Sequence, residues 1–146
     1  MPDFHKRRDG RNQIKIYAVH PHAQANDLRL NRVAQRVLKA EGWSFDLKII
    51  LADDAELRRL HRLFLGADEA TDVMAFAGDA QDSGAGEIYI SLDQAREQAL
   101  QEGHTLQRAV ERLLIHGILH LGGWDDSTRA ERAKMLAYGE RYLSAR

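Results

Sequence analysis

Residues 113–126 have the sequence Leu113-Leu114-Ile115-His116-Gly117-Ile118-Leu119-His120-Leu121-Gly122-Gly123-Trp124-Asp125-Asp126. The strongly polar side chains in its apolar first part are two histidines, His116 and His120, which lie four positions apart. On a helix this spacing places both imidazoles on one face. The two glycines that follow allow the chain to turn back and bring a carboxylate to them. The pattern His-x3-His-x5-Asp, which ends at Asp126, predicts a metal site, since a catalytic zinc is typically held by three protein ligands and keeps its fourth position for water.

The burial expected for this segment supports the same interpretation. The helix predicted from Thr105 has polar residues at positions 107, 108, 111 and 112, whereas its last nine residues are apolar nearly all round. Such a half-helix is buried, and a buried imidazole without a partner costs on the order of 1 to 3 kcal/mol. A metal ion satisfies both imidazoles at once, and the Gly-Gly turn with its aspartates favours this solution. The alternative is that each imidazole bonds a carbonyl or hydroxyl group and that no metal binds.

Position 117 separates two kinds of metal chemistry. Zinc proteases of the His-Glu-x-x-His kind carry a glutamate directly after the first histidine, where it acts as general base. Gly117 stands at this position and cannot transfer protons, so a peptidase would lack its central catalytic group. A glycine inside a helix also costs roughly 1 kcal/mol relative to alanine. We therefore expect close packing at Gly117.

Length and composition limit both the fold and the site. With 146 residues the chain is expected to form one domain, residues 1–146. It contains no cysteine, which excludes disulfides and thiolate ligands and leaves His, Asp and Glu to bind a metal. The charged N-terminus has no apolar segment behind it, and no apolar run is long enough to span a membrane, which predicts a cytoplasmic protein.

The charge balance does not by itself predict a nucleic-acid-binding protein. Lys and Arg number 21 and Asp and Glu number 22, for a formal net charge of −1. RNA binding therefore needs a local basic patch. Three candidate groups are Lys6, Arg7, Arg8 and Arg11; Arg29, Arg32, Arg36 and Lys39; and Arg58, Arg59 and Arg62. The alternative for each group is an ordinary solvated surface of mixed charge.

Hydrophobic periodicity predicts an α+β fold. Expected strands cover residues 13–19, 45–51, 71–77 and 87–92, and expected helices cover 27–41, 53–65, 93–102, 105–121 and the segment from Thr128 to the C-terminus. We therefore expect a single domain with a small mixed sheet of about four strands covered by about five helices. The strand order is not predicted. The Gly-, Asp- and Ser-rich loop 78–86 and its flanking strands are expected to wall a cleft.

The residues around the two histidines resemble a known signature. Residues His116–Asp126 are similar to the motif His-Gly-x-Leu-His-Leu-x-Gly-Tyr-Asp-His of the YbeY family of bacterial endoribonucleases and ribosomal RNA maturation factors. Upstream, Thr71–Phe76 is similar to the family's Thr-Asp-Val-Leu-Ser-Phe, and Gly86–Ser91 is similar to its Gly-Asp-Ile-x-Ile-Ser. The order of the expected elements agrees with the family from Leu30 to Leu143, so the resemblance covers most of the chain.

This resemblance implies a zinc-protease-like fold and a zinc-dependent, single-strand-specific endoribonuclease. It would act in ribosomal RNA maturation, at the 3′ end of the small-subunit RNA, and in ribosome quality control. The implied partners are precursor ribosomal RNA and the ribosome or its proteins, with neither DNA nor a membrane. His116 and His120 match two zinc ligands of the family, and Asp126 stands where the family has a third histidine. A carboxylate still binds zinc, but such a ligand set also suits other divalent transition metals.

Two further positions concern catalysis. Leu65 stands where the family carries an arginine thought to serve the active site, whose guanidinium would bind the scissile phosphate. Arg62, one helical turn earlier, is predicted to reach the same space; the alternative is an ordinary exposed arginine. Asp125 matches the family's aspartate and is expected to orient a ligand or the bound water. Alternatively, Asp125 is the third ligand and Asp126 caps the next helix.

Three functions follow as hypotheses. The favoured one is a metal-dependent endoribonuclease. The second is a zinc-binding, ribosome-associated factor with weakened or lost catalysis, because Leu65 and Asp126 depart from the family pattern. A metallopeptidase is a distant third. The remaining histidines, His5, His20, His22, His61 and His104, are expected to be solvent-exposed side chains rather than ligands.

Overall fold

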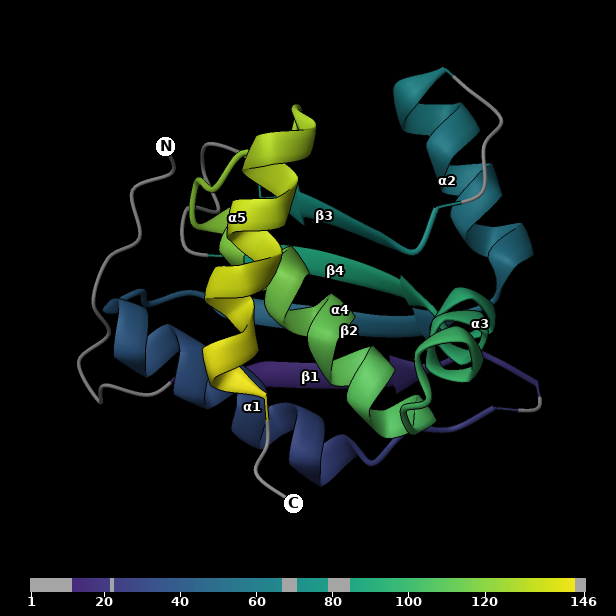
Figure 1. Ribbon diagram of the computed structural model, residues 1–146, viewed down its shortest axis with the longest axis horizontal. Coiled ribbons are helices and arrows are strands. Elements are labelled where there is room, and N and C mark those ends of the chain that lie inside the picture. The colour runs from purple at the N-terminus through teal and green to yellow at the C-terminus, as the bar shows by residue number, and fades with distance from the viewer. Residues whose placement is uncertain (1–11, 22, 67–70, 79–84, 144–146) are drawn as a thin grey trace.

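A computed structural model describes residues 12–21, 23–66, 71–78 and 85–143, which form a sheet with helices packed on it (Figure 1). The strands are β1 (Ile14–Ala18), β2 (Asp46–Ala52), β3 (Val73–Ala77) and β4 (Ala85–Ser91). The helices are α1 (Asp27–Glu41), α2 (Asp54–Leu65), α3 (Leu92–Glu102), α4 (Leu106–Leu121) and α5 (Arg129–Gly139), followed by the 3-10 turn η1 (Glu140–Tyr142). The predicted α+β fold, with four strands and five helices in the described part of the chain, is confirmed.

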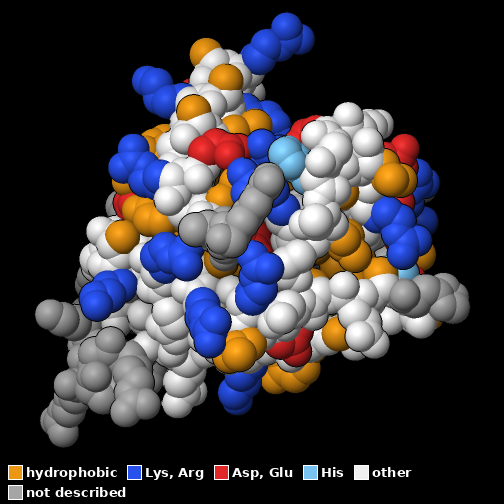
Figure 2. All heavy atoms as spheres, turned by 60° about the horizontal axis from the view of Figure 1, so that its bottom comes forward, with side chains coloured by type: hydrophobic (Ala, Val, Ile, Leu, Met, Phe, Trp, Pro, Cys, Tyr) orange, Lys and Arg blue, Asp and Glu red, His pale blue; other side chains and the backbone are white. Residues whose placement is uncertain are grey.

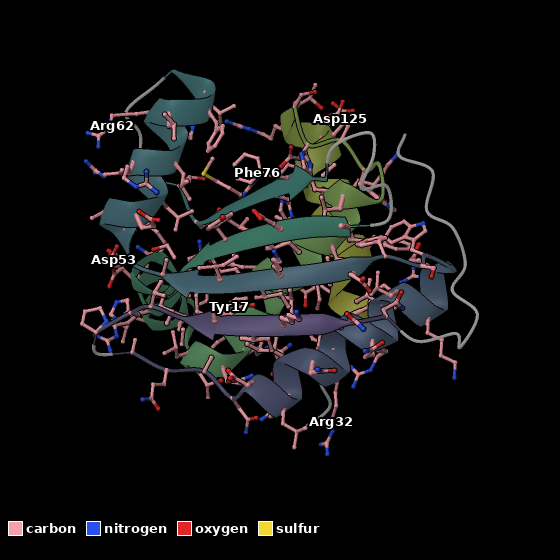
Figure 3. All side chains as sticks on the ribbon, turned by 180° about the vertical axis from the view of Figure 1, so that it is seen from behind. Tyr17, Arg32, Asp53, Arg62, Phe76 and Asp125 are labelled. Carbon is pink, nitrogen blue, oxygen red and sulfur yellow. The ribbon has the colours of Figure 1, made fainter. Side chains whose placement is uncertain are left out.

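The sheet is mixed, with the strand order β1-β2-β4-β3. Strands β1, β2 and β4 are parallel, and β3 pairs antiparallel with β4 at the edge. Across the sheet, Ile16 lies opposite Ile49, and Ile49 opposite Ile88. These side chains belong to or pack against the main core, which they share with α1, α4 and α5. On the other face α2 covers the β3 side through a smaller cluster that includes Leu57, Leu60 and Met74 (Figure 3).

Helix α4 is the central element of the core. Its second half is almost entirely buried, as the sequence predicts. A Cβ atom added at Gly117 would lie 2.9 Å from Ile88 Cγ2 of β4, which is closer than side chains pack. The expectation of close packing at Gly117 is therefore confirmed. Because α4 approaches β4 this closely, the residues on either side of Gly117 are held near the sheet.

The turn after α4 also depends on its two glycines. A Cβ atom at Gly122 would lie 2.1 Å from the ring of Trp43, so this position has no room for a side chain. Gly123 has a φ of 106°, in a region that other residues rarely adopt. Beyond the turn, Thr128 accepts a hydrogen bond from Glu131 N, and the Glu131 carboxylate accepts one from Thr128 N, which is the predicted capping box of α5. The turn thus returns the chain toward the end of α4.

The expectation of a solvent-exposed His20 is wrong. The side chain is 6% exposed, and its Nε2 lies 2.8 Å from Asp93 Oδ1. Its Nδ1 accepts a hydrogen bond from Ala23 N, so Nε2 carries the proton and donates to Asp93. Asp93 also accepts from Asp54 N. This network ties the segments after β1, β2 and β4 together at the edge where the parallel strands end.

We predict that Gly117→Ala destabilises the protein despite the better helix propensity of alanine. Overpacking costs about 1–3 kcal/mol, and Ile88 is held in the core and cannot move aside freely. Urea unfolding of the single variant, of Ile88→Ala and of the double variant tests this. The alanine at 117 is expected to cost less in the Ile88→Ala background, because the methyl group that it contacts is absent. Equal costs in both backgrounds would contradict the proposed contact.

Candidate metal centre

An open cleft of about 380 Å³ runs along β3 at the edge of the sheet. Its walls come from β3, the end of α2, the second half of α4 and the beginning of α5. The polar residues of its lining are His61, Thr71, Asp72, His116, His120, Asp126 and Arg132. Segments that are distant in sequence therefore contribute titratable side chains to one hollow. The expected contribution of loop 78–86 concerns mainly residues 79–84, which lie outside the described residues.

The cleft brings His116, His120 and Asp126 together. His116 Nε2 lies 3.1 Å from Asp126 Oδ2, and His120 Nδ1 lies 3.8 Å from Asp126 Oδ1. One carboxylate thus faces both imidazoles. The arrangement follows from local structure, because α4 places the histidines one turn apart and the Gly-Gly turn returns Asp126 to them. The side chain of His116 is 6% exposed, whereas that of His120 is 45% exposed.

Burial determines the protonation state of His116. Loss of hydration lowers the pKa of this imidazole below its ordinary value, and the hydrogen bond with Asp126 only partly opposes this effect. His116 is therefore neutral near pH 7, which is the form that binds a metal. Its Nδ1 is buried and has no hydrogen-bond partner among the described residues. The imidazole is thus held in place by packing and by Asp126, with Nε2 directed to the carboxylate.

The donor set fits a divalent metal ion in type and spacing. Two ligands at 2.0–2.1 Å from a tetrahedral ion are about 3.4 Å apart, and the observed nitrogen–oxygen distances of 3.1 and 3.8 Å lie on either side of this value. Within the described residues, no three His, Asp or Glu side chains already converge on one point. The two imidazoles face different oxygens of Asp126. Binding an ion therefore requires side-chain adjustment, for which the half-exposed His120 has room.

Asp125 lies apart from this group. Its carboxylate accepts hydrogen bonds from the backbone N–H and the hydroxyl of Ser127. The backbone bond is the main reason why the pKa of Asp125 is lowered. Figure 3 shows Asp125 at the outer end of the turn, and it is not part of the cleft lining. Asp126 does not cap α5, since Thr128 occupies that position. The geometry therefore favours Asp126 over Asp125 as the carboxylate that faces the histidines.

Arg62 is not brought to the cleft either. From α2 the lining includes His61 and Leu65, which are four residues apart and share a face of the helix. Figure 3 shows Arg62 on α2 pointing away from β3. The prediction that Arg62 reaches the space near the histidines is therefore not met by this arrangement. His61, expected to be a solvent-exposed side chain, is partly buried in the cleft wall.

Sequence reasoning missed two charged residues of the cleft. Arg132 lies one turn into α5, with Nη1 3.5 Å from Asp126 Oδ2 and Nη2 3.9 Å from Asp72 Oδ2. Asp72 also accepts a hydrogen bond from Gln98 Nε2. Asp72 could have been predicted, because it belongs to the segment Thr71–Phe76 that resembles a family motif. No local sequence pattern predicts a role for Arg132. Their contact depends on how the first turn of α5 is placed near the start of β3.

Two histidines and a carboxylate in an open cleft are typical of metal-dependent hydrolases. Comparison with known proteins assigns the family within this class. The family model for Endoribonuclease YbeY matches residues 14–146, and the chain belongs to this family.

Relatives and a solved structure agree with this assignment. The Endoribonuclease YbeY of Pelotomaculum thermopropionicum is 39% identical over 124 residues, covering 78% of this chain and 82% of that protein. The Endoribonuclease YbeY of Salinibacter ruber is 37% identical and covers 90% of each chain. The solution structure of TM1509 from Thermotoga maritima is 27% identical, with a TM-score of 0.59 and 89% of each chain covered. The family resemblance inferred from the sequence motifs is thus confirmed.

The geometry predicts which carboxylate retains metal. Purified protein is expected to bind one zinc ion, and Asp126→Ala and His116→Ala are expected to lose it, because each removes a donor from the shared contact. Asp125→Ala is the matched control and is expected to retain zinc. Elemental analysis after dialysis measures the stoichiometry, and circular dichroism checks that each variant is folded. If Asp125→Ala loses zinc and Asp126→Ala retains it, Asp125 rather than Asp126 is the third metal ligand.

Proposed function

We propose that this chain is a metal-dependent endoribonuclease that cleaves single-stranded RNA during maturation of ribosomal RNA. The 3′ end of the small-subunit RNA is the proposed substrate region, with a further role in ribosome quality control. One observation carries the proposal: within an open cleft of a chain of the endoribonuclease YbeY family, the Asp126 carboxylate faces both His116 and His120. Membership of that family supports RNA as the substrate.

The proposed metal is zinc, held by His116, His120 and Asp126. When bound, the ion would supply Lewis acidity toward a phosphate oxygen and lower the pKa of water toward about 7. The carboxylate adds negative charge where a third imidazole would add none, which weakens this acidity and also suits other divalent transition metals. His116 would contribute a neutral, buried donor, and its hydrogen bond with Asp126 would be replaced by binding of both side chains to the ion. Asp125 is proposed to act only through the turn that positions Asp126.

Features around the cleft support an extended substrate. Phe76 lines both the cleft and a second hollow of about 320 Å³, which is also lined by Lys15 of β1 and Lys48 of β2. The two hollows are therefore neighbours on the sheet. A chain of several nucleotides fits such a surface better than a single small molecule does. The second hollow is also lined by Asp46 and Glu87, so positive charge alone does not define where an RNA strand would bind.

The basic group expected on α1 contributes little independent support. Figure 2 brings the α1 side forward and shows Lys and Arg side chains spread among acidic and hydrophobic ones. Arg29 lies 3.4 Å from the buried Glu111, and Arg36 donates a hydrogen bond to the carbonyl of Tyr142. The basic group at residues 6–11 lies outside the described residues. Association with the ribosome or its proteins is therefore proposed from the family relation.

No described helix has the length and apolar character needed to cross a membrane. A cytoplasmic location is proposed because it gives access to ribosomal RNA precursors.

A second candidate is a metal-binding, ribosome-associated factor with weakened catalysis. The observation that favours it is the position of Leu65, which lines the cleft where a cation would be useful, whereas Arg62 does not. A peptidase is disfavoured by Gly117, which lines the cleft at the position of the protease glutamate and carries no side chain.

The nuclease proposal is tested with zinc-loaded protein and a labelled single-stranded RNA. We expect endonucleolytic cleavage of this RNA, little cleavage of the same sequence in a duplex and none of the corresponding DNA. A chelator should abolish cleavage, and added zinc should restore it. Arg129→Gln serves as a variant outside the cleft lining and should cleave within about threefold of the wild type, in keeping with the small effects of surface substitutions. Wild-type protein that retains zinc but cleaves no RNA would instead support the binding-factor function.

A further inference from the structure

Arg132 is the one Lys or Arg side chain in the cleft lining, taken over the described residues. It projects from α5, and its side chain is 47% exposed. Its guanidinium lies near two carboxylates, Asp126 and Asp72, which come from the turn before α5 and from the start of β3. The cleft therefore combines the three proposed metal ligands with a permanently charged cation.

The contacts of Arg132 leave its guanidinium available. The distances of 3.5 and 3.9 Å to Asp126 and Asp72 are longer than the 2.7–2.9 Å typical of hydrogen bonds between charged groups. Arg112 offers a comparison within the same chain: its Nη2 lies 2.6 Å from Glu140 Oε1, and it also bonds Glu102. Arg112 is thus engaged by short ion pairs, whereas Arg132 makes one long hydrogen bond to Asp126 and a more distant ion pair with Asp72.

The two carboxylates near Arg132 already have other partners. Asp126 faces the imidazoles of His116 and His120, and Asp72 accepts a hydrogen bond of 2.9 Å from Gln98. A guanidinium carries five N–H donors, and two neighbouring carboxylates leave some of these donors without an acceptor. Together with its exposure, this leaves Arg132 able to bind a further anion in the cleft. The anion that belongs there, if the proposed function holds, is a phosphate of RNA.

We propose that Arg132 binds the scissile phosphate of the RNA and stabilises the negative charge that develops on it. This inference rests on the proposed function and names a residue that carries it out. Asp126 connects these groups, because its Oδ2 faces both His116 and Arg132 and its Oδ1 faces His120. A phosphate placed against the proposed metal ligands is therefore within reach of the guanidinium. Two parallel N–H groups of an arginine match two phosphate oxygens.

A residue that binds the phosphate and a residue that only positions Asp126 have different consequences when Arg132 is replaced. A positioning residue affects metal retention, and a cation of any shape would replace it. A phosphate-binding residue affects cleavage while metal binding persists, and lysine replaces it poorly because its ammonium group lacks the planar fork. Partial rescue of cleavage by an external guanidinium ion, in a variant whose zinc content is unchanged, therefore supports the phosphate-binding role.

The test compares Arg132→Gln, Arg132→Lys and the control Arg129→Gln, which removes a charge from the same helix one turn earlier, outside the cleft lining. We expect Arg132→Gln to keep its zinc and to lose about 10²- to 10³-fold in kcat/KM, the usual effect of removing one transition-state donor. Arg132→Lys should lie between this variant and the wild type. Guanidinium chloride, below concentrations that unfold the protein, should partly rescue Arg132→Gln. Arg129→Gln should stay within about threefold of the wild type.

Binding is measured separately, so that failure of this inference is distinguishable from failure of the proposed function. The probe is a 2′-O-methylated oligonucleotide of the same sequence, shown by electrophoresis to stay intact, and its Kd is obtained by fluorescence anisotropy with zinc-loaded protein. Arg132→Gln should weaken binding relative to Arg129→Gln. If the wild type cleaves RNA and Arg132→Gln cleaves equally well, or if its loss of activity follows loss of zinc, the inference is wrong. If the wild type cleaves no RNA, the proposed nuclease fails, and equal Kd values for both variants would overturn the Arg132 contact as well.

Discussion

The close approach of α4 to β4 at Gly117 determines where the site can form. With no side chain at this position, the backbone of α4 lies directly against Ile88 in the sheet. His116 is then held beside the edge strand β3, in surroundings that leave it almost fully buried. His120 follows one turn later at the more exposed end of the helix. A larger residue at 117 would move the helix outward and both imidazoles with it, so packing and chemistry depend on the same glycine.

The chain after α4 completes the site, and it also depends on glycines at positions where another residue would not fit. Gly122 gives the backbone room beside Trp43, and Gly123 adopts the positive φ that reverses the chain. These two positions bring Asp126 to both imidazoles and start α5 so that Arg132 faces the cleft. The carboxylate then faces two imidazoles and a guanidinium, with His116 and Arg132 both near its Oδ2. The positive charge of Arg132 offsets the negative charge that Asp126 brings to the proposed metal centre, which favours retaining the Lewis acidity of the ion.

Local periodicity was enough to predict most of this arrangement. The spacing of His116 and His120, the helix that carries them and the turn to Asp126 all depend on residues close together in sequence. Long-range placement was not predictable in this way. Whether α2 presents Arg62 or His61 to the cleft depends on its rotation about its axis, which Leu57 and Leu60 set by packing near Met74 on the sheet. Each residue step turns a helix by about 100°, so an error of one position changes the face. The burial of His20 and the meeting of Arg132 with Asp72 likewise depend on segments far apart in the chain.

X-ray absorption spectroscopy of the zinc-loaded protein tests the central claim, that His116, His120 and Asp126 bind one ion. We expect scattering from two imidazoles at about 2.0–2.1 Å and from a carboxylate oxygen at about 2.0–2.2 Å, with one imidazole contribution lost in His120→Ala. A zinc spectrum without imidazole scattering, or one unchanged in His120→Ala, would contradict the claim and place the metal elsewhere.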